Sequence, residues 1–153
     1  MAPPRTRDLA RVDFRDQHEG PPADASLDEL VHRLFRDRPR WVDIAMSVRH
    51  FLVRPFGLDT TSGSDAPRSL TEGTRAGPFW ILSVNPDEIV AGLDDRHLDF
   101  RVYLTKKQGL VVRTDVSFHN ALGRIYFALI RLGHVWVVRS MLRRTVPSIA
   151  SAA

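Results

Sequence analysis

The alternation of apolar and polar residues predicts a strand followed by helices in the first half of the chain. Leu9 to Asp16, "LARVDFRD", alternates with the period of a strand, and "EGPPAD" then ends it at the edge of a sheet. A helix begins at Ser26, because Ser26 and Glu29 form a capping box. Its apolar residues have the spacing of one buried helix face: Leu27, Leu30, Val31, Leu34 and Phe35.

A second helix and a long loop are predicted next. Pro39 opens the helix as its first residue, and Pro55 with Gly57 closes it. The apolar face between them consists of Trp41, Ile44, Ala45, Val48, Phe51 and Leu52. Residues 58–77 are rich in Ser, Thr and Gly, and a loop of this length inside a compact domain is functional or mobile.

The chain beyond Gly77 has the pattern of antiparallel strands. "PFWILSV" and "IVAGL" are apolar runs joined by the turn sequence "NPDE". "HLDFRVYLT" and "LVVRTDVSF" form a further hairpin around "KKQG". Placing Leu104 opposite Leu110, with Gly109 left-handed in a five-residue loop, brings both apolar sets to one face.

The opposite side of this hairpin is polar. His97, Asp99, Arg101 and Tyr103 on one strand face Arg113, Asp115, Ser117 and His119 on the other. Mixed charges on an antiparallel pair most often form solvated cross-strand pairs, which is the interpretation we favour. The alternative is that these side chains form the polar wall of a site.

A helix from Asn120 to Val146 completes the pattern, with Asn120 as its N-cap. Arg124, Arg131 and His134 share a narrow polar stripe, and the rest of the circumference is mostly apolar, so the helix must be well covered. Val138 and Leu142 lie near this stripe. We expect a partner chain, as in a homodimer, or the N-terminal segment to cover them.

Size and composition indicate one domain, residues 9–146, between flexible tails 1–8 and 147–153. The chain has 153 residues and no cysteine, which excludes disulfides and thiolate chemistry. No signal sequence or apolar span is evident, so we expect a cytoplasmic protein. Five arginines and no acidic residue follow Asp115, but no nucleic-acid motif accompanies this charge, and nucleic acid is not expected as a partner.

Several strings resemble a known family. "LDDRHLDFRV", "HNALGRIYFALI" and "MLRR", with a weaker match at "VRHFLVRPFGL", are similar to the bacterial domain of unknown function 2867 family, over Trp41 to Arg144. The family has no established activity to carry over. Some relatives are appended to a short-chain-dehydrogenase-like nucleotide-binding domain, which this chain lacks. "RLGHVW" keeps His134 but lacks the proline that such relatives often have there.

The order of elements also resembles the helix-grip fold of START and polyketide-cyclase-like proteins. The resemblance implies an α+β fold in which a curved antiparallel sheet wraps a long C-terminal helix around an apolar cavity, with two helices after the first strand.

The residues reveal no catalytic machinery. His97, Asp99 and His119 could approach one another, but no metal-binding spacing accompanies them, and we expect no metal and no cofactor. His119, His134 and Asp99 could move protons, yet no nucleophile motif or phosphate-binding loop occurs, so the catalytic residues are unknown and an enzyme is not expected. His119 and Asn120 also have a structural interpretation, as the link between the last strand and the helix.

Two functions remain open. The first is binding of a small hydrophobic or amphipathic ligand between sheet and C-terminal helix. Its expected lining is Phe79, Ile81, Leu98, Phe100, Arg124, Leu129 and Trp136, with His97, Asp99, His119, Asn120 and His134 as nearby polar residues. The second is interaction with a protein partner or a membrane surface through the basic C-terminal helix. A cyclase-like or hydrolase-like enzyme ranks third.

Overall fold

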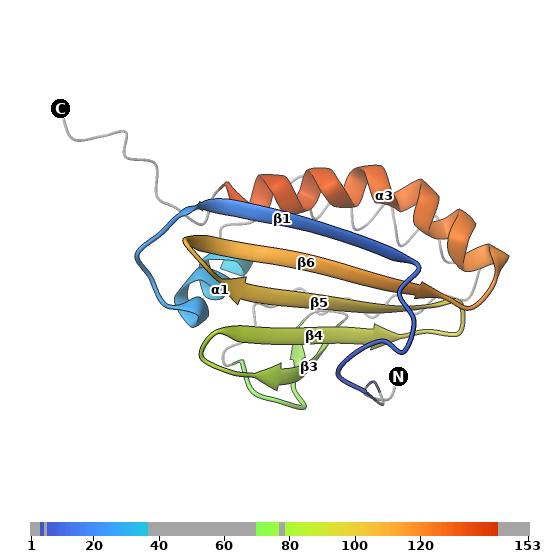
Figure 1. Ribbon diagram of the computed structural model, residues 1–153, viewed down its shortest axis with the longest axis horizontal. Helices are drawn as coiled ribbons and strands as arrows, with labels where there is room; N and C mark the ends of the chain where they lie inside the picture. Colours follow the sequence, from blue (N-terminus) through green and yellow to red (C-terminus); the bar gives the residue numbers. More distant parts are fainter. Residues whose placement is uncertain (1–3, 5, 37–69, 77–78, 144–153) are drawn as a thin grey trace.

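The computed structural model describes residues 4, 6–36, 70–76 and 79–143, which form an α+β fold around one curved, open sheet (Figure 1). Its strands are β1 (Phe14–Pro22), β2 (Arg75–Ala76), β3 (Phe79–Val84), β4 (Glu88–Asp94), β5 (Leu98–Lys106) and β6 (Gly109–Phe118). All neighbours are antiparallel, in the order β1-β6-β5-β4-β3-β2. The expected second helix lies outside the described residues.

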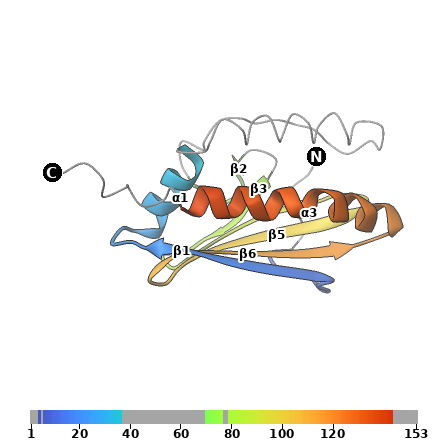
Figure 2. The same cartoon turned by 90° about the horizontal axis from the view of Figure 1, so that it is seen from above.

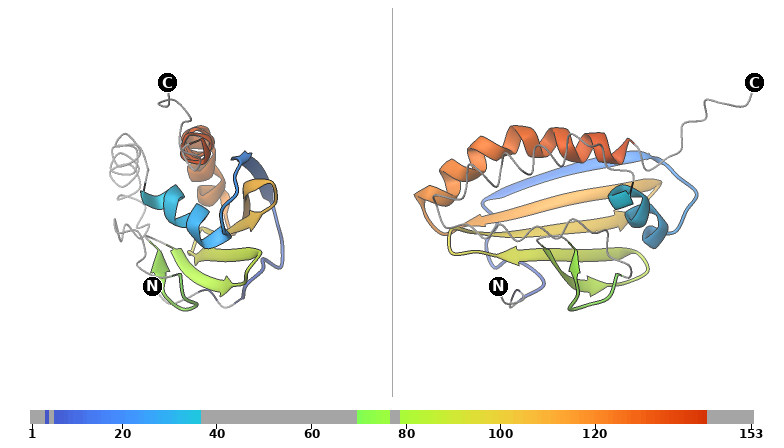
Figure 3. Two further views of the ribbon diagram at one scale, coloured as in Figure 1. Left: turned by 90° about the vertical axis from the view of Figure 1, so that its left-hand side faces the viewer. Right: turned by 180° about the vertical axis from the view of Figure 1, so that it is seen from behind.

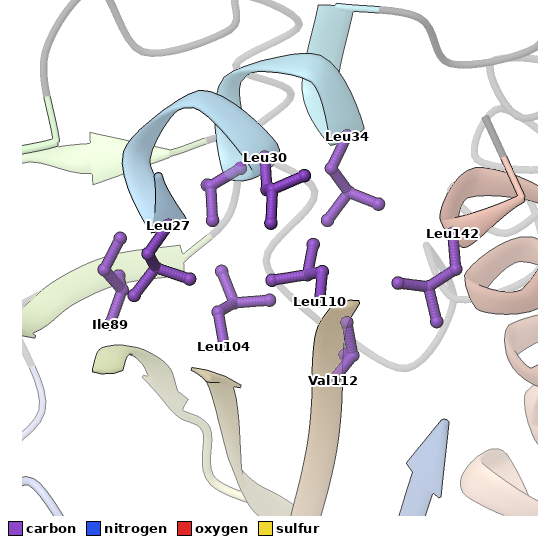
Figure 4. Packing of buried hydrophobic residues seen from close by; sticks show 9 residues of the cluster. Leu27, Leu30, Leu34, Ile89, Leu104, Leu110, Val112 and Leu142 are labelled. Atoms are coloured by element: carbon purple, nitrogen blue, oxygen red, sulfur yellow. The ribbon is translucent and has the colours of Figure 1, made fainter. Parts of the chain in front are cut away.

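Helices α1 (Leu27–Arg36) and α3 (Ala121–Leu142) pack on the same face of the sheet (Figures 2 and 3). Leu27, Leu30 and Leu34 of α1 point toward Leu104, Leu110 and Val112 of the sheet, as Figure 4 shows. Ser26 accepts a hydrogen bond from the Glu29 amide at 3.2 Å, which confirms this half of the predicted cap. Glu29 itself pairs with Arg33, one turn further along.

The first strand begins and ends later than its pattern indicates. β1 spans Phe14–Pro22, so the expected strand from Leu9 to Asp16 is displaced, and "EGPP" belongs to the strand rather than to a turn. Prolines are tolerated here because β1 is an edge strand, as predicted, and the register shifts between Glu19 and Pro22.

The predicted register of the β5–β6 hairpin is wrong by two residues. Leu104 lies opposite Val112, and Lys106 opposite Leu110, so the loop is shorter than the five residues expected. Gly109 is not left-handed; a Cβ there would lie 2.4 Å from the carbonyl oxygen of Pro21, so the glycine serves close approach of β1. An even shift preserves the faces, and both apolar sets still reach the same side.

The C-terminal helix starts where the sequence indicates. Asn120 is the N-cap of α3, and its Oδ1 accepts a hydrogen bond from the Gly123 amide at 3.0 Å. Leu142, at the other end, is buried against the cluster formed by α1 and the sheet, including Leu30 and Leu110. Leu142 is therefore covered by residues of the same chain. None of the helices in the described part is long and apolar enough to cross a membrane.

Candidate functional site

The centre of the polar face is buried, contrary to our interpretation of its pattern, whereas His119 at its end is exposed and pairs with Asp99 across the strands as expected. Arg101, Tyr103 and Asp115 are buried, with 1%, 3% and 2% of their surfaces exposed. Arg15 of β1 binds Asp115 through two hydrogen bonds, and the Arg113 guanidinium lies 3.8 Å from the centre of the Tyr103 ring. Arg101, Tyr103 and Asp115 thus form a buried centre, with Arg15 and Arg113 at its surface. The alternation of one strand cannot distinguish such a buried centre from a solvated face.

The N-terminal segment covers this buried centre. Arg101 donates to the backbone oxygens of Thr6 and Arg7, and its NH1 lies 2.6 Å from the Asp94 carboxylate. Tyr103 donates to the Asp8 carboxylate at 2.9 Å. Burial first, and then this hydrogen bond, raises the pKa of the Tyr103 hydroxyl. Residues 6–8, which were expected to belong to a loose tail, therefore contact the centre of the sheet.

Gly92 makes room for the buried arginine. It lies opposite Arg101 in the β4–β5 pair, and a Cβ at Gly92 would stand 2.7 Å from the Arg101 Cδ. A side chain there would push the guanidinium away from its carbonyl acceptors. The glycine in "IVAGLDD" is thus part of the arginine's site.

The motif histidines and Asp99 divide into two separate contacts. His119 Nε2 lies 2.9 Å from the Asp99 carboxylate, and His97 Nδ1 lies 3.1 Å from Asn120 Nδ2. Asn120 also donates to the backbone oxygen of Arg96. Across the described residues no three metal-binding side chains gather. The motif joins the β4–β5 turn to the start of α3.

Gly123 completes this junction. A Cβ at this position would lie 2.2 Å from the backbone oxygen of His97, so α3 can pack against the turn only with a glycine here. Gly133 is different, because a Cβ there would meet nothing within 4 Å. The two glycines of α3 look alike in the sequence and have different roles.

The expected lining residues do not share one described pocket. Phe79 and Phe100 stack with ring centres 5.5 Å apart, and Phe100 packs with Leu98 against Tyr126. Ile81 packs with Ala76 and Ala91 in a separate cluster. Trp136 is 71% exposed, and the side chains of Leu129 and His134 lie outside the described residues.

An open groove of about 620 Å³ lies instead between α3 and the β1 edge of the sheet. We call it the aromatic groove; it is lined by Asp13, Phe14, Phe118, Arg124, Phe127, Ala128 and Arg131. The Phe127 ring lies 4.8 Å from that of Phe14 and 5.4 Å from that of Phe118. Arg131 lies over the Phe14 ring at 5.6 Å. Of the expected lining residues, Arg124 contributes to this groove.

Two arginines and one aspartate line the aromatic groove, so its net charge is positive. Asp13 accepts hydrogen bonds from Arg11 and from the backbone amide of Phe118. The bond from Arg11 first, and that from Phe118 second, lowers the pKa of this carboxyl. Asp13 lines the groove and is bound by Arg11, and the charge of Arg124 also contributes to the lowered pKa of this carboxyl. Among the described residues, neither Arg124 nor Arg131 forms an ion pair with a carboxylate.

A second groove lies beside the end of β1. We call it the strand-end groove; it is lined by His18, Glu19, Gly20, Pro21, Arg139, Leu142 and Arg143. His18 Nε2 lies 2.8 Å from the Asp16 carboxylate. Gly20 allows Leu142 to approach the strand, since a Cβ at this glycine would lie 3.2 Å from the Leu142 side chain. The sequence pattern did not indicate this groove.

Comparison with known proteins gives a family and nothing finer. No curated protein and no solved structure shows a significant match to the chain. One family profile, described as a protein of unknown function, DUF2867, matches residues 9–141. That match includes the buried centre around Arg101, the Asn120 junction and the aromatic groove. On this match, the chain belongs to the DUF2867 family.

Proposed function

We propose that this domain binds a small amphipathic anion, with no chemical step. The observation that supports the proposal is the aromatic groove, where three phenylalanine rings lie beside two guanidinium groups that have no carboxylate partner among the described residues. A carboxylate or phosphate can be held by an arginine through paired hydrogen bonds, while rings receive the apolar part of the same molecule. The groove opens at the surface, which suits reversible loading.

A helix-grip relation is part of this proposal. The curved sheet with its C-terminal helix on one face agrees with that arrangement, and the ligand's apolar end would extend under α3 toward the expected lining residues. Of these, Phe79, Leu98 and Phe100 would form the inner part of the site, because they pack in the same cluster as Phe127 of the groove. Ile81 packs in a separate cluster and Trp136 is exposed, so these two lie outside it. The motif residues His97, Asp99, His119 and Asn120 support the start of α3 and take no part in chemistry, and His134 remains a candidate polar contact.

The direct test is native mass spectrometry of the freshly purified chain, followed by extraction under denaturing conditions. An added mass that is lost on denaturation, and is identified as an acidic amphipathic compound, is the expected result. A neutral compound would contradict the role of the arginines. A chain without added mass is then titrated with a medium-chain fatty acid, and failure to bind it removes the proposal.

An arginine variant tests the groove itself. Replacing Arg124 and Arg131 together by Gln is expected to weaken fatty-acid binding about tenfold or more, because charge-assisted hydrogen bonds are lost. Binding of the corresponding alcohol should change little. Arg96→Gln, an exposed arginine on the β4–β5 turn, is the matched control. Equal affinities for acid and alcohol in the unaltered chain would refute the assignment.

A further inference from the structure

β1 has an unpaired edge in the described part of the structure. Its one strand partner there is β6, and Arg15, Gln17 and Glu19 are exposed along it. In Figure 1, β1 lies at the rim of the sheet, directly beside α3. An edge strand presents backbone donors and acceptors to which another extended chain can bind.

The backbone direction along this edge follows from one hydrogen bond. The Gln17 amide donates to the Asp16 carboxylate at 2.9 Å. We infer from this bond that the amide points away from β6. Backbone groups of successive strand residues point to alternate sides. We therefore assign the outward-facing backbone groups to Arg15, Gln17 and Glu19.

Three arginines of α3 and Arg143, its C-cap, lie along the same edge. Arg124 and Arg131 line the aromatic groove near the start of β1, and Arg139 and Arg143 line the strand-end groove near its end. All four are exposed, and none forms an ion pair with another described residue. They form a row of positive charge parallel to the exposed strand edge.

The acidic groups of β1 do not neutralise this row. Asp16 is bound by His18, and Asp13, which precedes the strand, is bound by Arg11 and the Phe118 amide and interacts more weakly with Arg124. Glu19 is the remaining carboxylate, against four guanidinium groups. A second copy of this chain paired along β1 would bring its own arginine row against this one, so charge favours an acidic partner over a homodimer.

We propose that an extended acidic segment of a partner protein adds to the sheet along the free edge of β1. Its backbone pairs with Arg15, Gln17 and Glu19, and at Gln17 a carbonyl of the segment takes the place of the Asp16 carboxylate as the acceptor of the amide. Its acidic side chains meet the arginine row. Because strand side chains alternate between faces, the segment carries acidic residues at every second position. This inference goes beyond the proposed function, since it uses the strand edge and the strand-end groove.

The test uses the full chain and a labelled synthetic peptide that alternates glutamate with valine. Its twin has glutamine in place of glutamate. Fluorescence anisotropy is expected to show binding of the acidic peptide and an affinity for the twin that is lower by about tenfold or more. Arg139→Glu should weaken binding by about tenfold, while the control Arg96→Glu, with the same change in net charge, should leave it nearly unchanged. No binding, or equal binding of both peptides, overturns the proposal.

A backbone variant separates strand addition from simple charge attraction. Gln17→Pro removes one outward amide and keeps every charge, and is expected to weaken peptide binding about threefold to tenfold. Hydrogen exchange gives the same test without a substitution: the peptide should slow exchange at Arg15, Gln17 and Glu19, and not at Asp16 or His18. Uniform protection, or none, contradicts the pairing.

A membrane would use the arginines in another way. Sedimentation with vesicles rich in phosphatidylserine, lost in Arg139→Glu and unchanged in Gln17→Pro, would show a lipid surface and would overturn the strand proposal. The ligand proposal is tested at Arg124 and Arg131 with small acids, whereas Gln17 and Arg139 lie outside the aromatic groove. Either proposal can therefore fail alone.

Discussion

Arg101 and Arg131 are supported by the same sheet, one on each side of it, and their surroundings differ. Arg101 is 1% exposed, and backbone oxygens and Asp94 occupy its donors. Arg131 is exposed on α3, lies over the Phe14 ring and has no carboxylate partner in the described residues. Arginine thus lies at a buried centre on the side covered by residues 6–8 and is an exposed group on the α3 side, where we propose that it binds a ligand.

Arg101→Met should cause the largest loss of stability among single substitutions in the two regions. The substitution leaves Asp94 and several carbonyl oxygens without their donor. Each buried acceptor left unsatisfied costs about 1–3 kcal/mol, and we expect a total of about 3 kcal/mol or more. It should also release residues 6–8 from the sheet. Urea unfolding measures the loss, and faster proteolysis near Arg7 reports the release; a stability close to that of the unaltered chain would contradict the buried role.

Gly123→Ala distinguishes the two glycines of α3. Alanine favours a helix by roughly 1 kcal/mol over glycine, but the new Cβ would collide with the His97 oxygen, so we expect a net loss of about 1–3 kcal/mol. Gly133→Ala is the control and should stabilise the protein by up to about 1 kcal/mol. Thermal unfolding of the two variants measures whether each stabilises or destabilises the protein. A Gly123→Ala chain that is more stable than the unaltered chain would contradict the close contact between α3 and the His97 oxygen.

Asn120→Ala should cost about 1–2 kcal/mol, because α3 loses its N-cap and the contacts to the β4–β5 turn. Asn120→Asp keeps the oxygen that accepts from Gly123 and loses the amide donors to Arg96 and His97. It should therefore fall between the unaltered chain and Asn120→Ala in urea unfolding. Equal losses in the two variants would assign the whole effect to the turn contacts.

The buried tyrosine predicts a pH dependence. The folded chain raises the pKa of Tyr103 above its usual value of 10.0, so it favours the protonated hydroxyl. This contribution to stability is fully present below about pH 10 and is lost as the pH rises through the folded-state pKa. Tyr103→Phe should remove this alkaline loss from the unfolding profile. A loss of the same size in the variant would assign it to another group.

The sequence predicts the elements better than their surroundings. The Ser26 and Asn120 caps are local signals, and the structure confirms the hydrogen bond that each side chain accepts. It also confirms that β5 pairs with β6, but not in the predicted register. The burial of Arg101 is not a local signal, because two of its acceptors are the backbone oxygens of Thr6 and Arg7, about 95 positions away along the chain. Alternation alone gives a buried polar face and a wet one the same pattern.

The aromatic groove could not be predicted from the sequence for a related reason. Phe14, Phe118 and Phe127 come from three elements that meet only after β1 pairs with β6. The sequence did single out Arg124 and Arg131 as a helical stripe seven residues apart, which is half of the groove. The three phenylalanines could be brought together only with the strand order, in which β1 lies beside β6. Turn signals connect strands that follow one another along the chain, so they do not predict this pairing.

Urea unfolding of Arg101→Met beside the double variant Arg131→Gln/Arg139→Gln tests the division between the two sides most directly. We predict a loss of about 3 kcal/mol or more for Arg101→Met. For the double variant we predict a change within about 1 kcal/mol, since the contact of Arg131 with the Phe14 ring is exposed and neither arginine has an ion pair among the described residues. Comparable losses in both would contradict this division, since the α3 arginines would then belong to the structure rather than to binding.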